Sequence, residues 1–217
     1  MTAGLEAGLR TGLDQLGLRL DEPQVGQLLS YLELIRKWNQ VYNLTAVRKS
    51  AEMLTHHLLD SLAVIEPLRR MTQGRSTQLL DVGSGAGLPG VVISICCPEI
   101  EVDCVDTVAK KAAFLQQAAV TLQLGNLRGI HNRVEKLAGP YDVVASRAFA
   151  SLADFVAWSE TAKAGEGVWM AMKGKHPTDE IAALPATVEV FHVEQLQVPG
   201  LEAERCLVWL KSAPPVA

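Results

Sequence analysis

The chain has 217 residues, with 20 Lys and Arg against 24 Asp and Glu, and a net charge of −4 at pH 7. Its apolar fraction of 48% and charged fraction of 20% are typical of a soluble globular protein, and no apolar run is long enough to predict a membrane span. The length fits one domain with an appendage, and the acidic total means that any nucleic-acid contact must come from a local basic face.

The cysteines and the N-terminus predict a cytoplasmic protein with reduced thiols. None of Cys96, Cys97, Cys104 and Cys206 belongs to a Cys-x-x-Cys pair, so neither a metal site nor a disulfide framework is expected. The first residues, MTAGLEAGLRTGLDQL, carry acidic side chains inside an apolar pattern and lack the basic start of a secretory signal.

Residues 1–72 are expected to form a helical N-terminal extension. Over 24–43 the apolar residues recur with a period of about 3.6, and Trp38 lies on this stripe, which predicts that it is buried. A second helix is expected after Ser50, which is placed as its N-cap. Residues 72–77 (TQGRST) are expected to form a linker.

Residues 73–217 alternate short apolar runs with helical stretches, which is typical of βαβ units and a parallel sheet. Strands are expected at 78–82, 101–106, 127–131, 141–146 and 167–172. Helices are expected at 91–97, 107–124, 151–163 and 177–184, with Gly125 as the C-terminal glycine of the second of these. The last two apolar runs, VEVFHVEQLQV and RCLVWLK, are joined by a segment too short for a crossover helix and should pair antiparallel. We therefore predict a Rossmann-like α/β domain whose seven-stranded, mostly parallel sheet ends in an antiparallel hairpin.

The segment 79–90, LLDVGSGAGLPG, predicts a ligand-binding loop after the first strand. Gly83, Gly85 and Gly87 recur at alternate positions, and glycine is needed where a ligand lies against bare backbone. Ser84 and Leu88 belong to the same expected cofactor loop. The loop opens a helix, whose first amides favour an anionic group.

Two cofactor classes fit this loop. Gly85, Gly87 and Gly90 also satisfy G-x-G-x-x-G, with Asp106 about 20 residues further on, as in a dinucleotide site. Asp81 favours S-adenosylmethionine, because a carboxylate before the first glycine can accept hydrogen bonds from a methionine ammonium but would repel a pyrophosphate. Asp106 is placed to accept both ribose hydroxyls with either ligand. A parallel sheet that ends in a hairpin is typical of class I methyltransferases that use S-adenosylmethionine, whereas a nicotinamide-dependent oxidoreductase remains an alternative.

A third cofactor contact is expected at 132–135 (NRVE), after the third strand. Polar groups there are placed to recognise the adenine edge, with Val134 against its ring. For Arg133 and Glu135 alone, a surface ion pair is an equally good interpretation.

The segment around the fourth strand, YDVVASRAFAS, indicates the class of methyl acceptor. It has neither the Pro-Pro-aromatic loop that serves exocyclic nitrogens nor the cysteine that pyrimidine C5 requires. Guanine N7 needs neither, because it has a bare lone pair and no proton to lose. Arg147 lies at the carboxyl edge of the sheet, where ligands bind in open α/β folds, and arginine forks to guanine O6 and N7. We take Arg147 as the candidate catalytic residue that bridges cofactor and guanine.

Six segments resemble the bacterial 16S ribosomal RNA guanine-N7 methyltransferases, also called glucose-inhibited division protein B. They are WNQVYNLTAVR (38–48), HLLDS (57–61), LLDVGSGAGLPG (79–90), SRAFASL (146–152), MKG (172–174) and ERCLVWLK (204–211). The resemblance implies an S-adenosylmethionine-dependent monomer that methylates guanine 527, in a loop near the decoding centre of the small ribosomal subunit or its assembly intermediate. It implies cofactor contacts at Gly83, Leu88, Val134, Glu135 and Arg147. It implies an RNA-facing rim that includes Arg133, Arg147, Lys173 and Arg205.

Several further residues have two interpretations. Lys173 ends the fifth strand and is expected to contact phosphate, whereas Arg205 fits an RNA contact and a plain hairpin charge equally well. His57 and Asp60 lie three apart on one helix face, where they either fix the extension to the catalytic domain or line the mouth of the site. Asn43 and Thr45 are expected mainly to cap and turn the chain.

Basic residues in the N-terminal third, which are Arg36, Lys37, Arg48, Lys49, Arg69, Arg70 and Arg75, are placed either to solvate a face or to complete an RNA-binding rim. An RNA enzyme requires an open, positively charged mouth around Gly83. A small-molecule methyltransferase is the alternative, and would use the helical extension as a lid over an apolar cavity.

Overall fold

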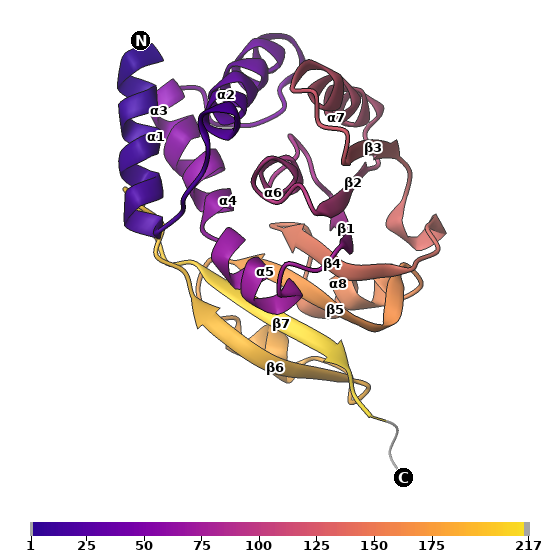
Figure 1. The fold of residues 1–217 in the computed structure, drawn as a ribbon. Coiled ribbons are helices and arrows are strands. Elements are labelled where there is room, and N and C mark those ends of the chain that lie inside the picture. Colours follow the sequence, from indigo (N-terminus) through magenta and orange to yellow (C-terminus); the bar gives the residue numbers. More distant parts are fainter. Residues whose placement is uncertain (1, 215–217) are drawn as a thin grey trace.

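A seven-stranded sheet forms the centre of the computed structural model, which describes residues 2–214 and the side chains from residue 4 onward (Figure 1). The strands lie in the order β3-β2-β1-β4-β5-β7-β6. Strands β1 to β5 pair parallel, and β7 pairs antiparallel with both β5 and β6. This confirms the predicted sheet with its terminal hairpin. The strands are β1 (Thr77–Val82), β2 (Ile100–Asp106), β3 (Leu127–His131), β4 (Tyr141–Arg147), β5 (Lys163–Lys173), β6 (Val188–Gln195) and β7 (Cys206–Ser212).

The strand order reverses between β1 and β4, which lie side by side although β2 and β3 separate them in the sequence. In open α/β sheets such a reversal leaves a crevice at the carboxyl ends of the strands, where ligands bind. The fold therefore places the residues after β1, β2 and β4 around one crevice.

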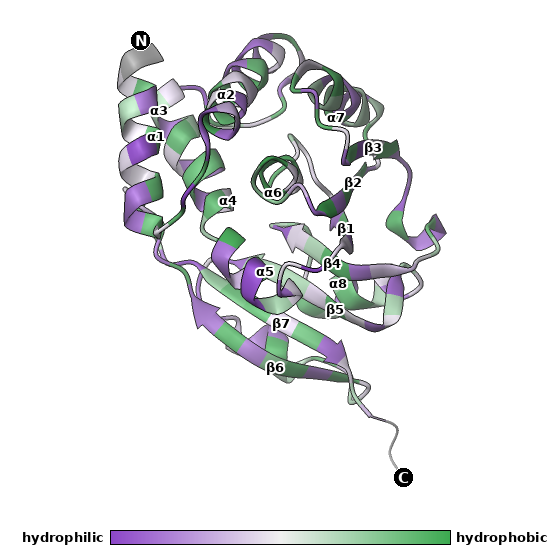
Figure 2. Ribbon diagram, viewed as in Figure 1, coloured by the Kyte–Doolittle hydropathy of each residue, from purple (hydrophilic) through white to green (hydrophobic). Residues whose placement is uncertain are grey.

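Helices cover both faces of the sheet because its side chains alternate between two cores. Leu79 belongs to the core shared with the N-terminal helices, and Leu80 belongs to the core shared with α8. Figure 2 shows α6 almost entirely in the hydrophobic colour, and every residue of this central helix is buried. The helices after β1 are α6 (Gly90–Cys96), α7 (Ala109–Thr121), α8 (Leu152–Ser159) and α9 (Thr178–Ala182), with a 3-10 turn at Val134–Lys136.

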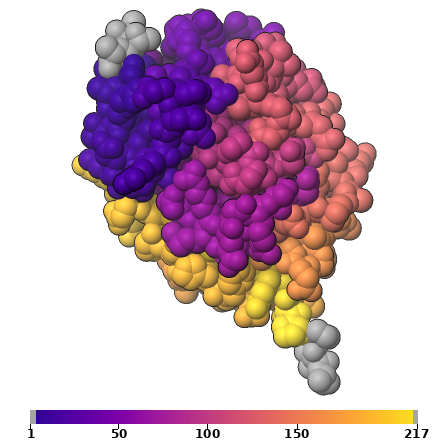
Figure 3. Space-filling view, viewed as in Figure 1, coloured from indigo at the N-terminus to yellow at the C-terminus, as the bar shows by residue number. Residues whose placement is uncertain are grey.

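The N-terminal helices pack against the sheet domain in one continuous core. They are α1 (Thr2–Leu16), α2 (Glu22–Tyr42), α3 (Ser50–Met53), a π-helix at Leu54–Leu59, α4 (Asp60–Leu62) and α5 (Ile65–Thr72). In Figure 3 they lie directly against the segment near residue 90. The hydroxyl of Tyr31 in α2 donates to the carbonyl of Ala86, so the extension also holds the glycine loop.

Local sequence explains where α2 begins and ends. The Asp21 carboxylate accepts from the Gln24 amide at 2.8 Å, and the Gln24 side chain accepts from the Asp21 amide at 3.1 Å, which together form a capping box. Asn43 ends the helix in the left-handed conformation, with φ of 51°. This agrees with the expectation that Asn43 turns the chain.

Two predicted caps are wrong. Ser50 is the first residue of α3, and Lys49 occupies the N-cap position without a side-chain hydrogen bond. Helix α7 ends at Thr121, and the left-handed residue after it is Gln123 rather than Gly125. In the second case the chain turns before it reaches the glycine, because the Leu124 amide bonds back to the Ala119 carbonyl. Within residues 2–214, no helix is long and apolar enough to cross a membrane.

Candidate functional site

The glycine loop leaves β1 at the centre of the crevice and is tied to the end of β2. The amides of Gly83 and Ser84 donate to the carbonyl of Val105, at 2.9 and 3.2 Å. Gly83 has φ of +67°, and a Cβ there would lie 2.3 Å from the ring of Phe149. Only glycine fits this position without strain, which leaves bare backbone facing the crevice.

Two cavities meet at this loop, and both are lined by Gly83 and Ala148. The first has a volume of about 440 Å³ and lies between the loop, the N-terminal helices and the ends of β4 and β5. The second has a volume of about 460 Å³ and lies between the ends of β2, β3 and β4. The arrangement suits an elongated ligand that crosses the loop, with one end in each cavity.

The second cavity combines apolar walls with a carboxylate. Val108 and Trp158 line it and are 37% and 41% exposed, which is unusual for large apolar side chains, and Val134 lines it from the 3-10 turn. Asp106 is 6% exposed, and its oxygens accept from the amides of Val108 at 2.8 Å and Gly85 at 3.0 Å. Each oxygen retains one lone pair, so Asp106 can accept two more hydrogen bonds.

Phe149, Trp158 and Lys111 also line this cavity, and the sequence did not predict them as site residues. Phe149 lies against Gly83 and contacts Trp158 edge-on, with ring centroids 5.8 Å apart. The ammonium of Lys111 lies 3.6 Å from the Asp106 carboxylate. Phe149 lies in the turn after β4 and is part of the SRAFAS motif, whereas Trp158 lies in α8 and had no sequence signal.

Asp81 was predicted to contact the cofactor, and the structure places it below the surface of the crevice. Asp81 is 0% exposed and lines neither cavity, because its carboxylate points beneath the loop and accepts from the Gly90 amide at 2.9 Å. Burial raises its pKa to about 7, although the Gly90 amide, Ser84 and Arg147 act in the opposite direction. Asp81 therefore anchors the start of α6 through Oδ2, while its Oδ1 is buried without a hydrogen-bond partner among the described residues.

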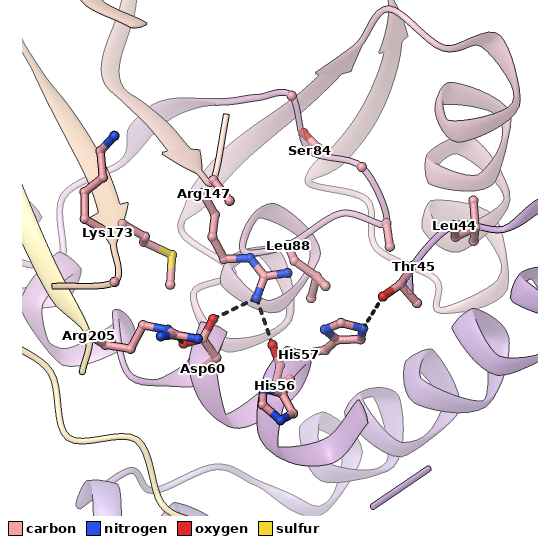
Figure 4. Close-up of a pocket in the computed structure, with 16 residues that line it drawn as sticks. Leu44, Thr45, His56, His57, Asp60, Ser84, Leu88, Arg147, Lys173 and Arg205 are labelled. Carbon is pink, nitrogen blue, oxygen red and sulfur yellow. Dashed lines mark hydrogen bonds and ion pairs between the residues drawn. The ribbon is translucent and has the colours of Figure 1, made fainter. Parts of the chain in front are cut away.

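The first cavity contains a buried ion cluster on Asp60 (Figure 4). One carboxylate oxygen accepts from Nη1 of Arg147, and the other accepts from Nε of Arg205, each at 2.7 Å. The Asp60 side chain is 3% exposed. The three residues come from α4, the end of β4 and the position just before β7, so the cluster joins the helical extension to both halves of the sheet domain.

The π-helix explains how this cluster forms. In an α-helix the carbonyl of His56 would accept from the amide of Asp60, but here that amide bonds to Thr55 and His57 carbonyls instead. The His56 carbonyl accepts from Nη1 of Arg147 at 2.9 Å. The wider turn thus presents a carbonyl and a carboxylate to the same guanidinium.

His57 lies on the same segment and lines the first cavity. Its Nε2 is 2.9 Å from the hydroxyl of Thr45, which also lines the cavity. Burial and the nearby Arg147 charge lower the pKa of His57 to about 4, so the ring is neutral at pH 7. Thr45 also accepts from the Val47 amide, as expected of a turn residue.

The predicted RNA-facing residues do not form one group. Arg147, Lys173 and Arg205 line the first cavity, whereas Arg133 is exposed beside Glu135 at the second. Figure 4 shows Lys173 directed away from the Asp60 cluster, and its ammonium is held by Glu180 and the Ala150 carbonyl, at 2.7 and 2.8 Å. A phosphate would have to compete with those two partners for Lys173.

The charge around the loop is positive on one side. Among the described residues that line the first cavity, there are three cationic side chains, Arg147, Lys173 and Arg205, and a single carboxylate, Asp60. The second cavity is balanced between two cations and two carboxylates. The N-terminal basic residues add less charge than their number suggests, because Arg36, Arg69 and Arg70 each pair with a glutamate: Glu33, Glu66 and Glu194.

Trp38, which was predicted to be buried, is partly buried and packs against the core, with its ring edge-on to Phe114 at 5.4 Å between centroids.

The sequence model of the family described as rRNA small subunit methyltransferase G (GidB) matches residues 24–208. The ribosomal RNA small subunit methyltransferase G of Acidovorax ebreus (strain TPSY) is 67% identical over 215 residues and covers 95% of each chain. The protein of the same name from Polaromonas naphthalenivorans (strain CJ2) is 62% identical over 213 residues, which is 95% of this chain and 96% of that protein.

Solved structures agree on the fold. Magnesium protoporphyrin IX methyltransferase from Synechocystis PCC 6803 has a TM-score of 0.61 at 14% identity and covers 89% of this chain and 99% of its own. TrmN from Thermus thermophilus has a TM-score of 0.55 at 16% identity and covers 74% of this chain and 53% of its own. Together with the family match over most of the sequence, these findings show that the chain belongs to the rRNA small subunit methyltransferase G family.

Proposed function

We propose that this chain transfers a methyl group from S-adenosylmethionine to N7 of a guanine in 16S rRNA, at guanine 527, the position that the family resemblance implies. The observation that carries the proposal is the pair of cavities that meet over the bare backbone of Gly83. One cavity suits a nucleoside, and the other has room and positive charge for the remaining half of the cofactor and an RNA base.

The second cavity fits the adenosine half. Asp106 has two free lone pairs for the two ribose hydroxyls, and Val134 and Trp158 supply apolar walls for a purine. Glu135 lines the same end and is available to an exocyclic amine. The methionine half then crosses Gly83 into the first cavity, beside Ser84, Gly85 and Leu88. Gly87 allows the loop to pack closely against α6, because a Cβ at this position would lie 2.4 Å from the Val91 side chain.

When bound, the cofactor supplies an electrophilic methyl group on a positively charged sulfur. Guanine N7 donates its lone pair to that carbon, the electrons of the carbon–sulfur bond return to sulfur, and the positive charge passes to the purine. No proton moves, so the chain needs no general base. This agrees with a neutral His57 whose pKa is about 4.

The residues of the first cavity therefore act by placement and by excluding water. Arg147 has Nε and Nη2 without a hydrogen-bond partner among the described residues, and these donors suit guanine O6. Arg205 and Lys173 line the same cavity and would contact RNA phosphates at its mouth. Arg133 lines the second cavity and extends the basic rim in that direction. The chain acts as a monomer in this proposal, because one chain supplies all of these groups.

The open mouth argues against a small-molecule substrate. The helical segment contributes His56, His57 and Asp60 to the lining of the first cavity, whereas a lid over a small-molecule site would be apolar. A small-molecule methyltransferase remains the second candidate on the basis of the fold alone.

The test is transfer of a radiolabelled methyl group to small ribosomal subunits that lack the modification, followed by mapping of the labelled base. Free 16S rRNA and assembly intermediates serve as parallel substrates. We expect label on one guanine, released as 7-methylguanine. Label on another base, or none with a protein that binds the cofactor, would refute the proposal.

A further inference from the structure

The Asp60 cluster contains a carboxylate that the methyl transfer itself does not use. Asp60 is buried, and each of its oxygens holds one arginine at 2.7 Å. A buried carboxylate between two guanidinium groups leaves a fixed net charge of one positive unit. Such a cluster is costly to desolvate, and removing one member leaves an uncompensated charge.

The cluster leaves donors free on the cavity side. Arg147 donates only from Nη1, to Asp60 and the His56 carbonyl. Arg205 donates from Nε to Asp60 and from Nη1 to the Glu204 carbonyl. Nη2 of both arginines has no hydrogen-bond partner within residues 2–214. The two forks are thus held in fixed directions with unused N–H groups, which is the arrangement expected of preorganised binding groups.

Two unpaired arginines would be a poor environment for the proposed reaction. The methyl donor is cationic at sulfur, and N7 methylation moves that charge onto the purine. Guanidinium groups stay protonated, so they would repel a positive charge both before and after transfer. Among the described residues that line the first cavity, Asp60 is the only carboxylate that offsets this repulsion.

We propose that Asp60 is the positioning and charge-balancing residue of the acceptor site: it orients Arg147 and Arg205 toward the RNA and makes a cationic methyl donor tolerable beside them. This inference rests on the proposed function. It assigns a role to the contact between the helical segment and the sheet domain, because α4 supplies the carboxylate, the end of β4 supplies Arg147, and the segment before β7 supplies Arg205.

The test compares the affinities of S-adenosylmethionine and S-adenosylhomocysteine, which differ in the charge at sulfur. In Asp60→Asn the side-chain shape is kept and the charge is lost. We expect the affinity for S-adenosylmethionine to fall about threefold or more relative to that for S-adenosylhomocysteine. The double variant Asp60→Asn with Arg205→Gln restores the net charge of the cluster and should restore the ratio of affinities. Its KM for RNA should be higher than that of the wild type, because the Arg205 guanidinium is lost.

Glu194→Gln is the matched control. Glu194 in β6 pairs with Arg70 in α5 at 2.6 Å, so this ion pair also joins the helical segment to the hairpin but lies outside both cavities. If Asp60 only fastened the two parts together, both variants would lower thermal stability and leave the affinity ratio unchanged. An unchanged ratio in a folded Asp60→Asn protein would overturn the proposal.

Arg205→Gln keeps the test decisive if Asp60→Asn does not fold. This variant removes one positive charge from the cluster and should raise the affinity for S-adenosylmethionine relative to S-adenosylhomocysteine. A ratio that stays at the wild-type value would also overturn the proposal. Failure of the wild-type protein to methylate small subunits would instead refute the proposed function, so the two failures are distinguishable.

Discussion

Gly83→Ala tests whether the bare backbone of the loop is required. Gly83 has φ of +67°, and an added Cβ would lie 2.3 Å from the Phe149 ring. The left-handed conformation costs an alanine about 1–2 kcal/mol, and displacing a packed ring costs about 1–3 kcal/mol more. We therefore expect a loss of about 2–5 kcal/mol in the free energy of unfolding.

Gly74→Ala provides the matched comparison. Gly74 has the same φ of +67°, but no atom lies within 4 Å of an added Cβ, and the residue lines neither cavity. This variant should lose only about 1–2 kcal/mol, which for a chain of this size lowers Tm by roughly 2–8 °C. Calorimetric titration with S-adenosylhomocysteine should give wild-type affinity for Gly74→Ala.

For Gly83→Ala, the same titration should show binding that is weaker by about tenfold or more, since the displaced Phe149 ring moves within the second cavity and the Cβ covers the joint between the cavities. Equal effects of the two substitutions on both unfolding and binding would refute the reasoning.

Three further predictions concern single side chains. Trp158 lines the second cavity, so S-adenosylhomocysteine should change its fluorescence; Trp158→Phe should abolish the change, and Trp158→Ala should weaken binding by about fivefold or more because base–aromatic contacts contribute about 1–3 kcal/mol. A full fluorescence change in Trp158→Phe would contradict this. Because burial lowers the pKa of His57 from 6.5 to about 4, the unfolded state takes up this proton first as pH falls, and the folded state loses up to about 3 kcal/mol of stability between pH 6.5 and 4. Urea unfolding should therefore show that the free energy of unfolding of the wild type falls relative to that of His57→Gln as the pH is lowered over this range. A constant difference between the two proteins would exclude the effect. Asp81→Asn should bind S-adenosylhomocysteine within about threefold of wild type, whereas loss of a direct ammonium contact would cost about tenfold or more.

The sheet could be predicted because each strand is marked by residues that lie close together in the sequence. Short apolar runs mark β1, β2 and β4, and the short connection before β7 allows only antiparallel pairing. The position of the glycine loop followed from the same pattern, since a glycine cluster directly after a buried strand must lie at the carboxyl edge of the sheet. The residues that line the crevice after β2 and after β3 were found for this reason.

The missed features depend on contacts between distant segments. The π-helix at Leu54–Leu59 has no local sequence pattern of its own, and its free carbonyl is satisfied by Arg147, which lies 91 residues further along the chain than His56. Asp81 has the same sequence context whether its carboxylate faces a ligand or the Gly90 amide, and only packing decides between them. Two of the three predicted RNA-facing arginines, Arg147 and Arg205, pair with Asp60, which required the fold to bring together α4, the end of β4 and the segment before β7.

The central claim is that the joined cavities bind a nucleoside methyl donor across Gly83. Isothermal titration calorimetry of the wild-type chain with S-adenosylhomocysteine, at two temperatures and with NADH as the comparison ligand, tests it most directly. We predict one S-adenosylhomocysteine per chain and no heat of binding with NADH. A folded protein that binds neither S-adenosylhomocysteine nor S-adenosylmethionine, or that binds NADH instead, would contradict the account.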